Sequence, residues 1–391
     1  MPPHRKRDLS VKRLRAVVLG TGVIGRVHID ALRRNQIEVV SVVASTEARS
    51  ITAAHELGVD RGDPDMATAI RMTAPDVVHI CTPDAYHFDH VTEALKAGKH
   101  VVCEKPLTTD AGSARVLYHH AKDSGQVHAI CFNNRFYTLM QELAARRRMG
   151  ALGQMFLVRA SVADDTFWLE TDWDWRLLPE MGGPTIVTST TGSHLLDLTS
   201  FLVGSHVIAV CADFLTAHTY RKRPGPDGRT ADYRTEGEDV SNILVHWANG
   251  TRGVLSLSHV AVGHPYRLRV EIDAASMGTS WDSERPNELW LGHRTEPNEV
   301  MVPDARQATA EGARFMENPG AYREGFSDTF RLLFREVYAS VAHGDPAKES
   351  PTFPTFRDGY AIQIVHDAIL VSARERRWVD VDWSPFHGTS S

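Results

Sequence analysis

The sequence predicts a two-domain protein of the α/β class, with an N-terminal doubly wound parallel sheet and a C-terminal α+β domain built on an open, mostly antiparallel sheet. Short apolar runs alternate with amphipathic stretches up to about residue 134, as in βαβ units. After that point strand-like alternation dominates. The length of 391 residues also exceeds that of one ordinary domain.

The N-terminal apolar runs are rich in Val and Ile, as strands of a parallel sheet are when both faces are buried. Gly58, Gly98 and Gly125 each follow a helical stretch, where glycine commonly ends a helix. The expected strands cover residues 16–19, 38–44, 77–81, 100–103 and 128–132, and the expected helices cover 27–34, 48–57, 88–97 and 111–124.

The C-terminal part reads as consecutive strands with short turns. Asn249-Gly250 between two apolar runs predicts a hairpin. Residues 221–237 are polar and rich in Gly, Pro and Arg, and are expected to form a mobile excursion. Strands are expected at 154–162, 207–215, 240–247, 253–260 and 267–273, and helices at 139–149, 194–202, 327–342 and 360–374.

Bulk properties exclude several classes of function. A net charge of −6 gives no reason to expect nucleic acid. No window reaches the roughly 18 apolar residues of a membrane span, and the first apolar run leads into glycines rather than a signal-peptide core. The chain is therefore expected to be cytoplasmic. Its scattered cysteines predict neither a metal site nor disulfides: Cys81, Cys103, Cys131 and Cys211.

Three segments are expected. Residues 1–12 form a disordered basic tail, residues 13–134 the dinucleotide-binding domain, and residues 135–391 a domain for substrate binding and oligomerisation.

A glycine-rich turn joins the first expected strand to the first helix. The first glycine allows the tight turn, the second a close backbone approach to a pyrophosphate, and the third close packing of helix and strand. The phosphates would sit at the helix N-terminus. The predicted cofactor contacts in this turn are Gly20, Gly22, Val23, Ile24 and Gly25.

The residues after the second strand bear on the choice between NAD and NADP. NAD enzymes usually place an acid there, whereas this chain has Ser45 and Thr46, followed by Glu47 and Arg49. Ser45 and Arg49 favour a 2′-phosphate, and Glu47 opposes it. Both cofactors remain open, and NAD is the first choice.

Two further motifs end strands at the edge of the sheet where ligands bind. Thr82 and Pro83 follow one strand, Glu104 and Lys105 follow the next, and His87 is included in the same expected cofactor site. A lysine beside the nicotinamide can hydrogen-bond a reacting hydroxyl. The alternative is a surface lysine paired with Glu104.

Taken together, these motifs resemble the Gfo/Idh/MocA oxidoreductases. The likeness rests on Gly-x-Gly-x-x-Gly-x-x-His from Gly20, the Cys-Thr-Pro, the Glu-Lys-Pro block, Trp173-Asp174-Trp175-Arg176, and Gly192-x-His-x-x-Asp, and it covers nearly the whole chain after the tail. Residues 284–294, 324–330 and 354–359 resemble the branch that holds levoglucosan dehydrogenase and glycoside 3-dehydrogenases.

The resemblance implies a Rossmann domain joined to an open-faced sheet that pairs into homodimers or homotetramers. It implies sugars, inositols or related polyols as substrates. By the same carry-over, Lys105 polarises the reacting hydroxyl, His194 exchanges its proton, and the hydride moves to the nicotinamide.

One position departs from the family pattern. The aspartate that usually precedes the catalytic histidine by four residues is Thr190 here. Either His194 works without it, the substrate differs from the usual sugar, or catalysis is weak, and we favour a different substrate. Thr190 is retained as an altered third catalytic residue.

The expected substrate wall lies at 164–176, where aromatic and charged side chains suit sugar rings and hydroxyls. Its density of acids suggests a cationic substrate such as an amino sugar or aminoglycoside. The expected substrate contacts are Trp168, Asp172, Trp175, Arg176, Asn133, Arg135 and His194.

The sequence thus predicts an NAD(P)-dependent dehydrogenase that oxidises a secondary hydroxyl of a small polar substrate: a sugar, glycoside, amino sugar or pseudo-sugar. The rival is a dinucleotide-sensing protein of the same fold with impaired catalysis, suggested by Thr190. A reductase would differ only in direction.

Overall fold

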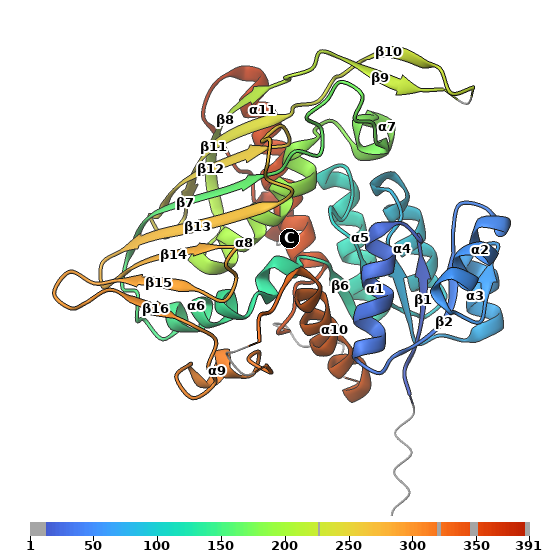
Figure 1. Ribbon diagram of the computed structural model, residues 1–391, viewed down its shortest axis with the longest axis horizontal. Helices are drawn as coiled ribbons and strands as arrows, with labels where there is room; N and C mark the ends of the chain where they lie inside the picture. Colours follow the sequence, from blue (N-terminus) through green and yellow to red (C-terminus); the bar gives the residue numbers. More distant parts are fainter. Residues whose placement is uncertain (1–12, 226, 319–321, 345–350, 388–391) are drawn as a thin grey trace, which may run out of the picture.

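The computed structural model describes residues 13–225, 227–318, 322–344 and 351–387. Within them, a parallel sheet flanked by helices is followed by a large open sheet, and the two lie side by side (Figure 1). The predicted fold class is confirmed. The expected basic tail at 1–12 lies outside the described residues.

The N-terminal domain contains a six-stranded parallel sheet of order β3-β2-β1-β4-β5-β6. Helices on both faces cover it, so its strands are almost wholly buried. The strands are β1 (Arg15–Leu19), β2 (Glu38–Val43), β3 (Gly62–Asp63), β4 (Val77–Ile80), β5 (His100–Cys103) and β6 (His128–Ile130), and the helices are α1 (Val23–Arg34), α2 (Glu47–Leu57), α3 (Met66–Thr73), α4 (His87–Lys96) and α5 (Ala111–Ser124).

The second domain contains a nine-stranded sheet of order β16-β15-β14-β13-β7-β12-β11-β8-β17. Its pairs are antiparallel except β7 with β12. Asn249-Gly250 forms the β11–β12 hairpin, as predicted. The strands are β7 (Met155–Ala163), β8 (Val207–Leu215), β11 (Val240–Trp247), β12 (Arg252–Ser258), β13 (Arg267–Ala274), β14 (Gly278–Asp282), β15 (Leu289–Gly292), β16 (Glu299–Met301) and β17 (Val379–Asp380).

Helices pack on one face of this sheet, and the described residues place none on the other (Figure 1). The long C-terminal helix α10 returns to the first domain, where Phe330 and Phe334 join its hydrophobic core. The helices are α6 (Thr138–Arg148), α7 (Pro179–Gly182), α8 (Ser193–Val203), α9 (Ala310–Ala313), α10 (Phe326–His343), α11 (Phe356–Glu375) and α12 (Ser384–His387). No helix in the described ranges is long and apolar enough to cross a membrane.

Several parts of the secondary structure differ from expectation, among them the unpredicted strands β14 to β17 and the short helices α7, α9 and α12. The short elements β3 and α3 have too few residues to show a period, and the sequence did not predict them. The segment 221–237 was expected to be a mobile excursion; the structure gives it two regular strands, and its mobility stays a prediction. It contains the hairpin of β9 (Tyr220–Pro224) and β10 (Thr230–Arg234), and the side chain of Arg221 is fully buried.

Candidate active site

A cavity of about 1780 Å³ lies at the carboxyl ends of β1, β4 and β5 and extends to the second domain. Its first half is lined by the glycine-rich turn, the end of β2, and the strand-end motifs at Thr82 and Lys105. Its second half is lined by residues around Thr190, His194 and Trp175. Residues far apart in the sequence therefore meet in one cleft.

The glycine-rich turn has a shape that other residues would not allow. Gly20 has φ +89°, and a Cβ there would lie 2.2 Å from the carbonyl oxygen of Cys81. A Cβ at Gly25 would lie 1.9 Å from the carbonyl oxygen of Gly20. Gly22 is the N-cap of α1 and no side chain caps it, so the first N–H groups of the helix stay open to a ligand. This cradle fits the pyrophosphate of a dinucleotide.

The end of β2 holds no carboxylate in the described structure. Ser45 and Arg49 line the cleft there, and Nη1 of Arg49 donates to Oγ of Ser45 over 3.1 Å. Thr46 instead caps α2 by accepting from the backbone N–H of Arg49.

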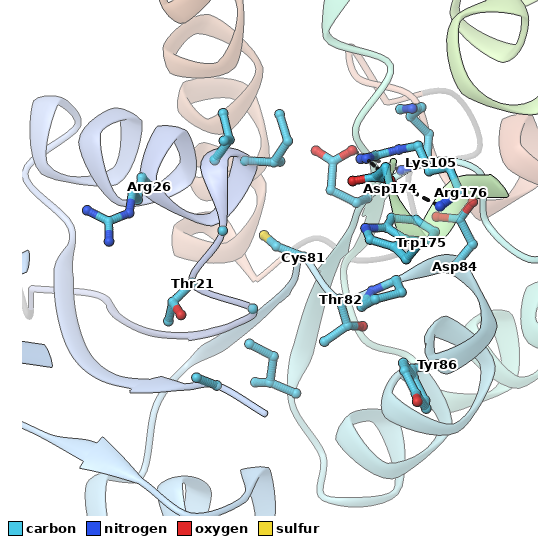
Figure 2. A pocket seen from close by; sticks show the side chains of 18 of the residues that line it. Thr21, Arg26, Cys81, Thr82, Asp84, Tyr86, Lys105, Asp174, Trp175 and Arg176 are labelled. Carbon is cyan, nitrogen blue, oxygen red and sulfur yellow. Dashed lines mark hydrogen bonds and ion pairs between the residues drawn. The ribbon is translucent and has the colours of Figure 1, made fainter. Parts of the chain in front are cut away.

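Lys105 reaches across the cleft to the second domain (Figure 2). Its Nζ donates to the carbonyl oxygen of Thr190 over 3.0 Å. Burial lowers the pKa of Lys105 against the opposing attraction of Glu104 and Asp84. The alternative of a surface lysine paired with Glu104 is wrong, because Glu104 is buried and its Oε1 lies 3.0 Å from Nε2 of His28.

His194 is buried at the start of α8 and lines the same cleft. Burial, together with the positive charge of Lys105, lowers the pKa of His194 to about 3. Its Nδ1 is buried without a hydrogen-bond partner in the described structure. A neutral imidazole therefore faces the cleft with one nitrogen unused by the protein.

Thr190 contacts a histidine that the sequence did not single out. Oγ1 of Thr190 lies 2.8 Å from Nε2 of His259, and Nδ1 of His259 lies 3.2 Å from Oδ1 of Asp164. All three residues are buried and line the cleft. Asp164 follows β7 and His259 follows β12, whose parallel register pairs Ala163 with Ser258. This pairing of distant strands is not visible in the sequence, so the sequence did not bring His259 to the site.

Behind Glu104 lies a buried polar chain. Nδ1 of His28 lies 3.0 Å from Nδ1 of His79, whose Nε2 lies 2.9 Å from Oη of Tyr338. Burial raises the pKa of Glu104, but the hydrogen bond with His28 outweighs burial and brings this pKa down to about 2. Among described residues, His28, Glu104 and Cys131 are also close enough to hold a metal ion, but His28 and Glu104 already bond each other.

The expected substrate wall is only partly in the cleft. Trp175 and Arg176 line it, with the Arg176 guanidinium 4.4 Å from the Trp175 ring centre, and so does the buried Asn133. Trp168 and Asp172 do not: Trp168 is 47% exposed, and Asp172 accepts from the backbone N–H of Leu169.

Two other expected contacts are used structurally. Arg135 pairs with Asp197 and Asp358 and borders a second, smaller cavity instead of the cleft. His87 is buried, with its ring nitrogens 2.9 and 2.8 Å from the carbonyl oxygens of Thr82 and Pro106. His87 thus links the two strand-end motifs by hydrogen bonds and does not line the cleft.

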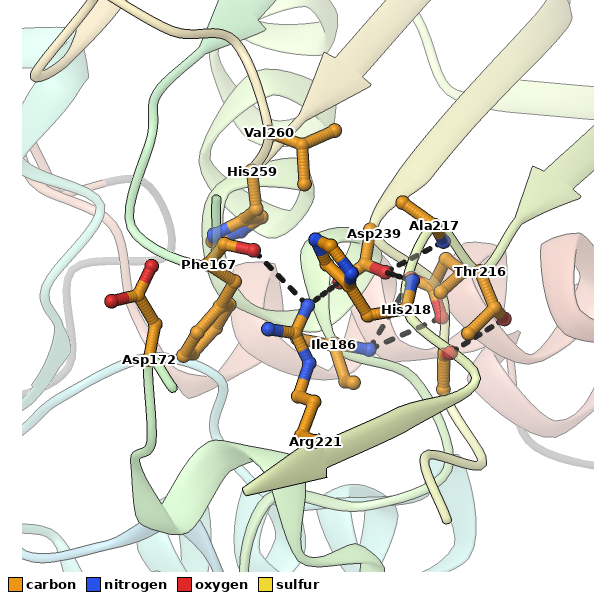
Figure 3. Close-up of polar contacts among 12 residues, drawn as sticks. Phe167, Asp172, Ile186, Thr216, Ala217, His218, Arg221, Asp239, His259 and Val260 are labelled. Atoms are coloured by element: carbon orange, nitrogen blue, oxygen red, sulfur yellow. Dashed lines mark hydrogen bonds and ion pairs between the residues drawn. The ribbon is translucent and has the colours of Figure 1, made fainter. Parts of the chain in front are cut away.

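A buried ion pair fixes the loop that carries Asp164 and Phe167 (Figure 3). Nη2 of Arg221 donates to Oδ1 of Asp239 over 2.6 Å and to the carbonyl oxygen of Phe167 over 3.1 Å. The Phe167 ring lies 5.4 Å from the His259 ring in a stacked orientation. The hairpin β9–β10 therefore supports the site from outside.

A dinucleotide cradle that opens toward a buried lysine and histidine of a second, open-sheet domain defines a two-domain dinucleotide-dependent oxidoreductase. Two family models identify the family of this chain. The oxidoreductase family with an NAD-binding Rossmann fold matches residues 14–132, and the GFO/IDH/MocA C-terminal domain matches residues 140–277. The chain belongs to the Gfo/Idh/MocA family.

Individual relatives cover nearly the whole chain. Levoglucosan dehydrogenase of Pseudarthrobacter phenanthrenivorans is 24% identical over 95% of this chain and 99% of its own. Inositol 2-dehydrogenase of Rhizobium meliloti is 25% identical over 93% of this chain and 98% of its own. A solved structure of levoglucosan dehydrogenase with NADH and L-sorbose superposes with a TM-score of 0.86 at 22% identity, over 95% of this chain and 99% of that one, and shows the shared fold.

Proposed function

We propose that the protein is an NAD(P)-dependent dehydrogenase that oxidises a secondary hydroxyl of a sugar, glycoside or related polyol to a ketone. The observation that carries this is the meeting of Lys105 and the neutral His194 in one cleft with the glycine cradle. The named relatives that act on levoglucosan and inositol support the substrate class.

The chain's residues divide the work. The glycine turn holds the pyrophosphate, and the cofactor supplies the hydride acceptor. Lys105 lies where its ammonium group can stabilise negative charge on the substrate oxygen. His194 is uncharged at neutral pH and can accept the hydroxyl proton, as a general base must.

We propose that both NAD and NADP are accepted and that Arg49 contacts a 2′-phosphate. In the described structure Arg49 has a hydroxyl partner but no carboxylate partner. Replacing Arg49 by serine should weaken NADP binding about tenfold or more, because a charge-assisted hydrogen bond to the 2′-phosphate is lost. NAD binding should be nearly unchanged.

Titration of protein fluorescence with each reduced cofactor measures this effect. Arg71→Ser is the matched control, because Arg71 is an exposed residue of α3 that does not line the cleft. Equal weakening of both cofactors by Arg49→Ser would show that the contact is not to the 2′-phosphate.

The substrate is proposed to be neutral. Of the acids that suggested a cationic substrate, Asp164 lies against His259, Asp172 accepts from Leu169, and Asp174 pairs with Arg176. Three of the five acids in 164–176 thus have partners within the protein. The test compares the turnover of amino sugars and aminoglycosides with that of neutral glycosides. Faster turnover of the amino compounds would contradict a neutral substrate.

We also propose pairing into a homodimer or homotetramer through the helix-free face of the large sheet. Exposed apolar side chains follow neighbouring strands there: Ile208, Leu244, Val254, Phe156 and Trp290. Sedimentation tests this, and a monomer at micromolar concentration would contradict it.

The function itself is tested by following NAD and NADP reduction with a panel of sugars, glycosides, inositols and amino sugars. Turnover of any panel member supports the proposal. Tight cofactor binding without turnover favours the sensing protein.

A further inference from the structure

The Asp164–His259–Thr190 group is more than the dehydrogenation proposed above requires of the second domain. One hydroxyl proton leaves the substrate for each hydride, and His194 already faces the cleft. Yet a second imidazole is present, buried at 3% exposure, with Nε2 2.8 Å from Oγ1 of Thr190 and Nδ1 3.2 Å from Oδ1 of Asp164. This order of groups is the one that holds an imidazole ready to take a proton from a hydroxyl.

His194 is poorly suited to keep the proton. Its pKa of about 3 follows from burial and the nearby Lys105 cation, which outweigh the opposing charge of Glu104, and its Nδ1 has no hydrogen-bond partner in the described structure. A proton placed there must move on at neutral pH. His259 differs in its contacts, because an oxygen of the Asp164 carboxylate lies 3.2 Å from its Nδ1.

The carboxylate is ionised. Burial raises the pKa of Asp164, but the contacts with His259 and Thr166 outweigh it and leave the pKa below its ordinary value. Phe167 stacks on the other side of the imidazole, and the backbone N–H of His259 donates to the carbonyl oxygen of Asp239 over 2.9 Å. The ring is therefore held in place on several sides.

We propose that His259, anchored by Asp164, is the group that holds the substrate's hydroxyl proton during oxidation, and that the hydroxyl of Thr190 passes the proton to it. The proposal rests on the dehydrogenase function proposed above. It gives Thr190, the position that departs from the family pattern, a role as a proton carrier rather than a lost carboxylate.

The bonds balance as follows. The substrate O–H bond breaks, its electron pair forms the C=O bond, and the hydride leaves the same carbon for the nicotinamide. The proton passes by way of His194 and a water in the cleft to Oγ1 of Thr190, which gives its own proton to Nε2 of His259. The imidazolium ion then lies against Asp164 until solvent takes the proton after product release.

The surroundings of Thr190 fit both ends of this transfer. Oγ1 lies 2.8 Å from Nε2 of His259 and 2.6 Å from the carbonyl oxygen of Ile186. In the structure the hydroxyl donates to Ile186, so for the transfer it turns toward His259 and gives its single proton there. After transfer His259 donates to Oγ1, and the hydroxyl turns to Ile186 instead.

The charged and titratable groups around His259 come from several elements. Asp164 follows β7, and Thr190 and Thr191 lie in the short helix η4 (Thr188–Gly192). Burial and the charge of Asp164 raise the pKa of Tyr266, which precedes β13. Arg221 and Asp239 neutralise each other beyond Phe167. Asp164 is the carboxylate that directly faces the ring.

The test uses the full-length protein with the best substrate of the panel. His259→Gln keeps an amide nitrogen near Thr190 but cannot be protonated. We expect kcat to fall about 100-fold, the usual contribution of a general base, with the Kd of the reduced cofactor and the Tm unchanged. We also expect the rise of kcat with pH to flatten, and imidazole in solution to restore part of the rate of His259→Gly.

The matched control is His264→Gln, a surface histidine 3.4 Å from Glu284 and outside the cleft, which should behave as wild type. A wild-type kcat in His259→Gln overturns the proposal. A lower kcat also overturns it if added imidazole does not restore the rate and the pH profile of kcat is unchanged. Absence of turnover in the wild type across the whole panel overturns the dehydrogenase itself. Turnover in the wild type and His259→Gln alike overturns the relay alone.

Discussion

Replacing Lys105 by methionine is expected to lower kcat at least about 100-fold while cofactor binding persists. Methionine preserves most of the length and the apolar stem of lysine but removes the ammonium group. In the wild type Nζ lies 3.0 Å from the carbonyl oxygen of Thr190 and close enough to Glu104 and Asp84 for their charges to act on it. Without it, negative charge that develops on the substrate oxygen loses the ammonium group proposed to stabilise it.

Steady-state rates and cofactor titration of Lys105→Met measure this directly. Lys96→Met at the exposed end of α4 is the control for removing a lysine. Near-normal kcat in Lys105→Met would rule out the role, whereas an equal loss of cofactor binding would move the residue from catalysis to cofactor positioning.

The second large effect is on stability. Arg221→Met is expected to lower the free energy of unfolding by about 3–5 kcal/mol, because it leaves the buried Asp239 carboxylate without its cation. Both side chains are fully buried, and Arg221 also holds the carbonyl oxygens of Phe167 and Leu169. Loss of these bonds frees the loop that carries Asp164.

Denaturant unfolding of Arg221→Met measures the change. Lys222→Met is a matched control on the next residue of β9, since Lys222 pairs with Asp232 at the surface and its loss should change little. Equal stability of the two variants would show that the Arg221–Asp239 pair does not hold the loop.

The N-terminal half of the site was predictable because its signals are local. A strand, a glycine turn and a helix follow one another at Gly20, and parallel strands bring their carboxyl ends to one edge, so Thr82 and Lys105 had to lie near that turn. The elements β3 and α3 were not predicted, because segments of so few residues show no periodicity.

The second half depends on long-range pairing that a single sequence does not show. Asp164 and His259 meet only because β7 and β12 are parallel neighbours in one register. Trp168 and Asp172 were expected in the cleft. The loop instead forms a turn closed by the hydrogen bond from Leu169 to Asp172, and both side chains lie outside the cleft. The polar composition of 221–237 hid the fact that Arg221 points inward to a buried carboxylate.

The central claim is that Lys105 and His194 make this cleft a dehydrogenase active site. The most direct measurement is reduction of NAD and NADP, followed by absorbance with the sugar, glycoside, inositol and amino-sugar panel, in wild type and His194→Ala side by side. We expect the wild type to turn over a neutral sugar or polyol, His194→Ala to abolish that turnover, and both proteins to bind the cofactor. Cofactor binding without turnover in the wild type, or equal turnover in His194→Ala, would contradict it.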